Sequence, residues 1–182
     1  MQDRKCIIHT QLLDVMLHRL YHQLIENHHD FETTVLLGLQ PRGIYFADRI
    51  QRRLETILDK KVNKGYLDTT FHRDDFRRRD SPLTPNKTEV PFLVEDKNVI
   101  LLDDVLYTGR SVRAALDAMV TFGRPRKVEL MVLIDRKYTR HLPIEPDYVG
   151  RAVNTIDSQR VLVEWEEQNE EDGVWITSKA TT

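Results

Sequence analysis

The sequence contains little cysteine, no long apolar run and almost no net charge, and each shortage excludes a class of protein. Cys6 is the single cysteine among 182 residues, which excludes an internal disulfide framework and a cysteine-rich metal site. No apolar run approaches the roughly 20 residues of a membrane-spanning helix, and no signal-peptide core follows the first residues. We therefore expect a cytoplasmic protein without a membrane partner. The formal net charge of -2 argues against bulk attraction to nucleic acid, although local basic patches remain open.

What is present suits one globular domain. A length of 182 residues fits a single domain, since domains most often have roughly 100 to 150 residues. The 40% hydrophobic and 31% charged residues are ordinary for a globular protein. We find no internal repeat and no linker, so we expect one domain over residues 1–182.

The segment 99–111 joins an apolar run, two adjacent carboxylates and a glycine-containing turn. Residues 99–102 show no polar alternation, which favours a strand buried on both faces of a parallel sheet. Asp103 and Asp104 would then lie at the carboxyl end of this strand, and residues 108–111 would lead into a helix. The free N–H groups of such a turn and helix start bind anions. The segment therefore predicts a phosphate cradle beside a carboxylate pair.

The remaining chain alternates helices with buried strands, which indicates an α/β fold with a mainly parallel sheet. Expected helices cover 10–27, 44–58 and 112–122. Expected strands cover 33–39, 64–71, 99–102, 127–134, a short stretch at 148–150, 160–166 and 174–177, the last two paired with each other. Thr10 is expected to cap the first helix. In the third helix, the apolar residues Val112, Leu116, Met119 and Val120 recur at helical spacing and are expected to form the buried face.

Charged or turn-forming residues follow four of these strands, at the sheet edge where open α/β folds bind ligands. They are Pro41 with Arg42, Arg73, Asp103 with Asp104, and Asp135 with Arg136. From residue 73 to about 95 the signals of order fade, and Arg77, Arg78 and Arg79 precede three prolines. This composition is typical of a loop, and it fits a solvated surface loop and a basic lid over an anionic substrate equally well.

A phosphosugar with a second phosphate group would satisfy two anion-binding turns with a carboxylate pair between them. One turn would hold the terminal phosphate, the carboxylates would bind ribose hydroxyls, and the other turn would hold pyrophosphate. A Mg²⁺ ion that bridges a hydroxyl and pyrophosphate oxygens would remove the repulsion between carboxylates and phosphate.

Residues 99–111, V-I-L-L-D-D-V-L-Y-T-G-R-S, resemble the phosphoribosyl-pyrophosphate (PRPP) motif of type I phosphoribosyltransferases. The wider chain is similar to the family of bifunctional pyrimidine-operon regulators and uracil phosphoribosyltransferases, from the first helix to about Val163. The landmarks are G-L-Q-P-R-G-I-Y at 38–45, D-T-T-F-H-R-D-D-F at 68–76, F-G-R-P at 122–125, V-L-I-D-R at 132–136, L-P-I at 142–144 and D-Y-V-G at 147–150. The resemblance implies a mainly parallel sheet flanked by helices, a small hood from roughly 136–165 with the N-terminal segment, a flexible basic lid at roughly 73–95, and a homo-oligomer.

The resemblance also implies a reaction, in which uracil and PRPP give UMP and pyrophosphate, and a role for each matching position. Asp103 and Asp104 would hold the ribose hydroxyls, directly or through Mg²⁺, and stabilise positive charge on the sugar. Arg73 would join this catalytic set from the lid. The 5′-phosphate would be bound by Tyr107, Thr108, Gly109, Arg110 and Ser111. Pro41 and Arg42 would bind pyrophosphate, and Asp135 and Arg136 would introduce the hood over uracil.

The superfamily often has a non-proline cis peptide bond in the pyrophosphate loop, at the position that aligns with Gln40-Pro41. A cis bond costs about 2.5 to 4 kcal/mol before other residues but only about 0.5 to 1 kcal/mol before proline. We therefore predict that Gln40-Pro41 is cis.

A second implied activity is binding to pyrimidine-operon leader mRNA, modulated by uridine nucleotides such as UMP and UTP. The RNA surface would consist of His18, Arg19, His22, Arg140 and Arg151. Three residues depart from the family pattern: His18 replaces a threonine, Lys137 a glycine and Glu145 a basic residue, and the Glu145 carboxylate would repel RNA phosphate. Two alternatives stay open, a purine-base phosphoribosyltransferase and a PRPP-binding or nucleotide-binding regulator without turnover.

Overall fold

The computed structural model describes residues 4–72, 86–156 and 158–178. Arg73, Arg77, Arg78 and Arg79 lie outside the described residues, as does most of the segment predicted to be a lid.

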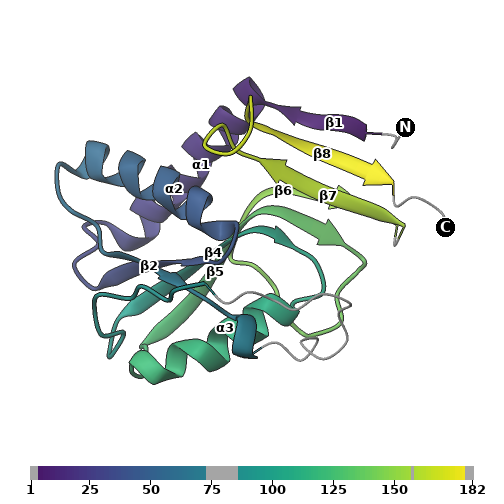
Figure 1. Cartoon of the computed structure of the whole chain (residues 1–182). Coiled ribbons are helices and arrows are strands. Elements are labelled where there is room, and N and C mark those ends of the chain that lie inside the picture. Colours follow the sequence, from purple (N-terminus) through teal and green to yellow (C-terminus); the bar gives the residue numbers. More distant parts are fainter. Residues whose placement is uncertain (1–3, 73–85, 157, 179–182) are drawn as a thin grey trace.

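A five-stranded parallel sheet forms the centre of the molecule, in the order β3-β2-β4-β5-β6 (Figure 1). Its strands are β2 (Thr34–Leu39), β3 (Lys64–Leu67), β4 (Asn98–Leu106), β5 (Lys127–Lys137) and β6 (Tyr148–Asn154). The predicted α/β class and parallel sheet are confirmed. The strand from residue 64 is shorter than predicted, because the chain forms a 3-10 turn (Thr70–His72) before it reaches the expected end. In contrast, β4 and β5 continue through their charged residues.

Helices cover both faces of this sheet. Helices α1 (Thr10–His28) and α2 (Gly43–Leu58) pack with Leu36, Ile100 and Leu102 on one face of the sheet. Helix α3 (Arg110–Met119) packs with Val35 and Leu101 on the other face. Figure 1 shows α3 on the side of the sheet opposite α1 and α2. This alternation follows from the two-residue period of a strand, and it explains why the strands read as continuous apolar runs.

One sequence prediction about the helices is wrong, and another is half right. Thr10 does not cap α1; its hydroxyl instead donates to the Asp172 carbonyl at 2.8 Å. In α3 the expected stripe is only half right, because Leu116 and Val120 are 36% and 68% exposed. Three alanines occupy the buried face instead, together with two of the expected residues: Ala114, Ala115, Ala118, Val112 and Met119.

A second, antiparallel sheet has the order β1-β8-β7 and lies beside α1 and α2 (Figure 1). It contains β1 (Arg4–His9), β7 (Gln159–Glu164) and β8 (Gly173–Ser178). The predicted pairing of the last two strands is confirmed. The sequence pattern did not predict β1. The predicted hood, residues 136–165, included β6, which belongs to the central sheet.

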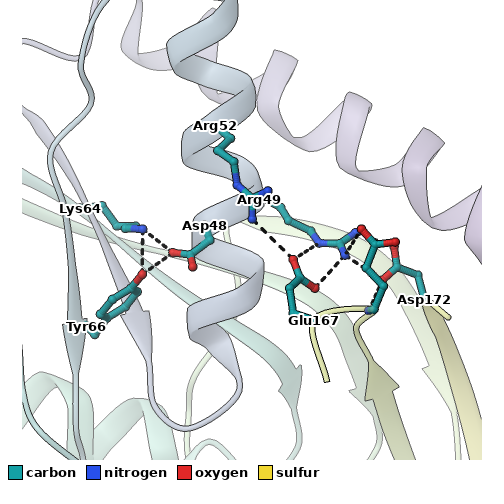
Figure 2. Close-up of polar contacts among 8 residues, drawn as sticks. Asp48, Arg49, Arg52, Lys64, Tyr66, Glu167 and Asp172 are labelled. Atoms are coloured by element: carbon teal, nitrogen blue, oxygen red, sulfur yellow. Dashed lines mark hydrogen bonds and ion pairs between the residues drawn. The ribbon is translucent and has the colours of Figure 1, made fainter. Parts of the chain in front are cut away.

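Arg49 joins this second sheet to α2, as Figure 2 shows. Its guanidinium donates to both oxygens of Glu167, at 3.1 and 2.8 Å, and to both oxygens of Asp172, at 2.5 and 2.9 Å. It also lies 4.9 Å from the ring of Trp165. The acidic segment between β7 and β8, whose role the sequence left open, therefore holds α2 against the second sheet.

Among the described residues, the helices are too short or too polar to cross a membrane.

Candidate active site

The predicted phosphate cradle forms where β4 ends and α3 begins. Tyr107, Thr108 and Gly109 form the turn, and residues 105–112 with Asp103 line a pocket of about 90 Å³. Gly109 has a φ of +89°, a conformation that glycine adopts without steric cost. The backbone N–H of Arg110 lies 3.4 Å from the Thr108 hydroxyl. Residues that are adjacent in sequence thus line one small polar hollow at a helix N-terminus.

The two aspartates lie within β4, the strand that leads into this cradle, and Asp103 lines its pocket. Asp103 is partly exposed, and its Oδ1 accepts a hydrogen bond from the Asp104 backbone N–H at 3.0 Å. Asp104 is 6% exposed, and its Oδ2 has no hydrogen-bond partner among the described residues. Burial raises the pKa of the Asp104 carboxyl, while the positive charge of Arg42 acts in the opposite direction. A buried carboxylate oxygen without a partner is costly, and it marks a position where a ligand could bind.

This pair also suits a shared Mg²⁺ ion. Magnesium is usually held by one or two carboxylates together with water and substrate oxygens. The described residues contain no cluster of three or more histidine, cysteine, aspartate or glutamate side chains that could enclose a metal ion. The two carboxylates therefore fit an ion whose other ligands are water and ligand oxygens.

The predicted pyrophosphate loop lies directly against these aspartates. The Gln40-Pro41 bond is cis, as predicted. Gly43 begins α2, and a Cβ atom at this position would lie 2.4 Å from the Leu102 carbonyl oxygen and 3.3 Å from the Asp103 Cα. The missing side chain lets the start of α2 press against β4. As a result, the positive charge of Arg42 acts on Asp104. The turn at Pro41 and Arg42 and the turn at Tyr107 to Gly109, far apart in sequence, thus form one site.

Asp68 is a buried acidic residue at the end of the central sheet that sequence reasoning did not single out. It follows β3, is 9% exposed, and accepts hydrogen bonds at Oδ1 from the Thr70 N–H and hydroxyl, at 3.1 and 2.7 Å. Its Oδ2 accepts the Asn86 N–H at 3.0 Å. Asp68 therefore joins the two described segments on either side of residues 73–85. The Asp-x-Thr pattern, which is typical of a side-chain turn, was the available signal.

The predicted base-side residues lie inside β5 rather than after it. Asp135 is fully buried and pairs with Lys137 at 2.9 Å and Arg140 at 2.5 Å. The Arg136 side chain donates to the Thr155 hydroxyl at 2.8 Å and lies 3.9 Å from the Tyr107 ring. A pocket of about 430 Å³ opens beside them, lined by Asp135, Lys137, Tyr138, Arg140 and residues 142–146.

The structure brings most of the predicted RNA-binding residues onto neighbouring elements. His18, Arg19 and His22 are exposed on α1, which packs against β6, the strand that carries the exposed Arg151. Arg19 donates to the carbonyls of Val149 and Gly150, at 3.0 and 2.5 Å. Arg140 is not part of this group, because its guanidinium contacts the phosphate cradle and Asp135.

Comparisons with known proteins agree with this geometry. Residues 9–168 match the family model described as the phosphoribosyl transferase domain. A curated relative from Enterococcus faecalis, named bifunctional protein PyrR, is 41% identical over 174 residues, which cover 96% of this chain and 97% of the relative. The chain belongs to the PyrR family of type I phosphoribosyltransferases. A Bacillus cereus PyrR is 38% identical over 181 residues, covering 98% of this chain and all of the relative.

Solved structures share the fold of this chain at low identity. A hypoxanthine phosphoribosyltransferase from Staphylococcus aureus has a TM-score of 0.71 and 17% identity, with 97% of this chain and 93% of that chain covered. The enzyme of the same name from Trypanosoma cruzi has a TM-score of 0.72 and 14% identity, with 96% and 91% covered. These neighbours confirm the type I phosphoribosyltransferase fold.

Proposed function

We propose that this protein is a uracil phosphoribosyltransferase, which converts uracil and PRPP to UMP and pyrophosphate. The observation that carries the proposal is the unpartnered Asp104 oxygen beside the phosphate cradle, in a chain whose close relatives are bifunctional PyrR proteins. The N–H groups and hydroxyls of residues 107–111 bind the 5′-phosphate. Pro41 and Arg42 bind the pyrophosphate group.

The base occupies the 430 Å³ pocket beside Asp135, which adjoins the phosphate cradle through the hydrogen bond from the Leu142 N–H to the Thr108 carbonyl. Uracil N1 forms a bond to C1′ of the ribose while the bond from C1′ to the pyrophosphate oxygen breaks, and the N1 proton leaves to solvent. Positive charge develops on the sugar in this step, and the carboxylates of Asp103 and Asp104 stabilise it. Arg73, which lies outside the described residues, is proposed to neutralise the departing pyrophosphate.

Asp103 and Asp104 would also hold Mg²⁺, through water or through the ribose hydroxyls. The ion supplies neutralisation of the pyrophosphate charge. The side chains themselves orient the ribose for attack at C1′.

The direct test measures PRPP-dependent conversion of uracil, hypoxanthine and orotate by the purified protein with Mg²⁺ present. We expect UMP from uracil and little product from the other two bases. Turnover of hypoxanthine alone would support the purine-base alternative, which the fold neighbours share by name. Binding of PRPP or UMP without any turnover would support the regulator that lacks enzyme activity.

We propose RNA binding as a second function, supported by the bifunctional name of the relatives and by the basic residues on α1 and β6. The target is the leader of pyrimidine-operon mRNA, bound in the cytoplasm and controlled by UMP or UTP. The affinity for the protein's own operon leader should exceed that for shuffled RNA at physiological salt. Equal affinities would leave only nonspecific charge attraction. The proposal includes a homo-oligomer, which sedimentation velocity would detect.

A further inference from the structure

The segment after β5 is bonded to the backbone of the phosphate cradle. The N–H groups of His141 and Leu142 both donate to the Thr108 carbonyl, at 3.0 and 3.2 Å. The side chains of Leu142 and Ile144 would lie 3.5 and 3.3 Å from a Cβ atom placed on Gly109. The base-side segment and the cradle therefore form one packed unit.

Arg140 makes the charged connection within this unit. One terminal nitrogen donates to the carbonyl of Tyr107, and the other donates to Asp135 Oδ1 at 2.5 Å. The Arg140 side chain is 23% exposed, and that of Asp135 is fully buried. The planar, forked guanidinium suits this task, because it can donate in two fixed directions at once. A lysine ammonium carries the same charge but lacks the fork.

The contact with Tyr107 has a geometric consequence for the cradle. A peptide unit is planar, so the carbonyl of one residue and the N–H of the next point in opposite directions. Fixing the Tyr107 carbonyl therefore fixes the N–H of Thr108, and the bonds to the Thr108 carbonyl fix the N–H of Gly109. Both residues line the cradle.

Asp135 does not depend on Arg140 alone for its charge balance. Lys137 pairs with the second carboxylate oxygen at 2.9 Å. Loss of Arg140 would leave Asp135 with a cationic partner, whereas the Tyr107 carbonyl would lose its hydrogen bond from the guanidinium. The distinctive contribution of Arg140 is thus its connection to the cradle.

We propose that Arg140 is a positioning residue of the phosphoribosyltransferase site, which aims the cradle N–H groups at the 5′-phosphate and connects them to the base side. This role rests on the proposed function and replaces the RNA contact that the sequence suggested for Arg140. It predicts that changes at Arg140 act on ligands with a 5′-phosphate.

The test compares Arg140→Gln and Arg140→Lys with the wild-type protein. Arg126→Gln is the matched control, since Arg126 is exposed and immediately precedes the opposite end of β5. We measure the Kd for UMP by calorimetry, the KM for PRPP and the melting temperature. Because a hydrogen bond from a charged group is lost, Arg140→Gln should bind UMP and PRPP about 10- to 100-fold more weakly. Arg140→Lys should recover part of the loss, and Arg126→Gln should match the wild type.

Three outcomes would overturn the inference. In the first, Arg140→Gln binds UMP and PRPP within about twofold of wild type. In the second, only its melting temperature falls, and in the third, only its affinity for leader RNA falls. If Arg140→Gln does not fold, Arg140→Lys decides between the same outcomes. The failure of the proposed function is a separate result, because wild-type protein would then show no turnover of uracil.

Discussion

Asp104 is a buried carboxyl, and one of its oxygens has no hydrogen-bond partner among the described residues. Burying such an oxygen destabilises the fold, which suggests that Asp104 is kept for function. We predict that Asp104→Asn lowers kcat/KM for PRPP at least about 100-fold, because it removes a charge that stabilises the sugar cation. The free energy of unfolding should stay equal or rise, since burial already raises the pKa of the Asp104 carboxyl and disfavours its ionised form. Steady-state kinetics and urea unfolding measure the two effects.

Asp117→Asn is the control for this variant, because Asp117 is half exposed on α3 and pairs with Arg113 at 3.2 Å. It should leave both quantities nearly unchanged. A large loss of stability in Asp104→Asn, with a proportionate loss of activity, would show that Asp104 acts in folding.

His28 predicts a pH dependence of stability. Its ring pairs with Glu129 at 2.9 Å, yet burial dominates and lowers the pKa of His28 below its model-peptide value of 6.5. A histidine whose pKa is lower in the folded state than in the unfolded state takes up its proton more readily on unfolding. The stability it contributes is therefore complete above about pH 6.5 and decreases as the pH falls below that value.

Urea unfolding between pH 5 and 7.5 should show this decrease in the wild type and a shallower one in His28→Gln. His22→Gln, which changes an exposed histidine of the same helix, is the control. Identical slopes for the wild type and His28→Gln would contradict the assignment to His28.

At the scale of elements, Asp68 predicts a local effect. Asp68→Asn replaces one of two acceptor oxygens with a donor, so the N–H of Thr70 or Asn86 must lose its partner. We expect amide hydrogen exchange at these two residues to become faster, because the free energy of local opening falls by about 1 to 3 kcal/mol. Hydrogen exchange with mass spectrometry measures the change, and peptides from α1 should be unaffected. Unchanged exchange in segments 68–72 and 86–88 would rule out this junction.

The elements that could be predicted are those whose signals are contiguous. The strand, turn and helix around residues 98–119 and the Pro41-Arg42 turn each follow from neighbouring residues. The buried face of α3 was missed in part because alanine carries a weak hydrophobic signal, although three alanines lie against the sheet. The full length of β5 was missed because the partner of Asp135, Arg140, is supplied from the following segment, and sequence patterns do not show that a charge in a strand is paired.

At the scale of the whole molecule, contacts between distant segments decide the structure. The bond from Arg140 to Tyr107 spans 33 residues, and that from Arg49 to Asp172 spans 123. Neither could be read from the sequence without an alignment. The same reason explains why β1 was missed, since its only strand partner among the described residues is β8.

The attachment of the second sheet to α2 can be tested by Arg49→Met. The substitution leaves Glu167 and Asp172 without their shared cation, and the Asp172 side chain is 6% exposed. Breaking a largely buried ion pair on one side should lower the free energy of unfolding by about 3 kcal/mol. Urea unfolding followed by the fluorescence of Trp165, which is buried beside Arg49, measures the loss.

Arg52→Gln is the matched control, since the Arg52 side chain is 66% exposed and its ion pair with Glu167, at 3.5 Å, is longer than that of Arg49. Exposed pairs contribute about 0 to 1 kcal/mol, so this variant should remain close to wild type. Equal stabilities for Arg49→Met and Arg52→Gln would show that the apolar side chains of α2 suffice to hold the second sheet.

The pairing of β1 with β8 has a consequence for synthesis on the ribosome. Arg4 lies opposite Thr177, so β1 pairs with β8, the last of the described strands to be made. The central strands, Thr34 through Asn154, can associate while β8 is still in the tunnel. The second sheet cannot be completed before β8 has left the tunnel. Until β8 emerges, β1 presents an unpaired strand edge, a natural docking point for chaperones.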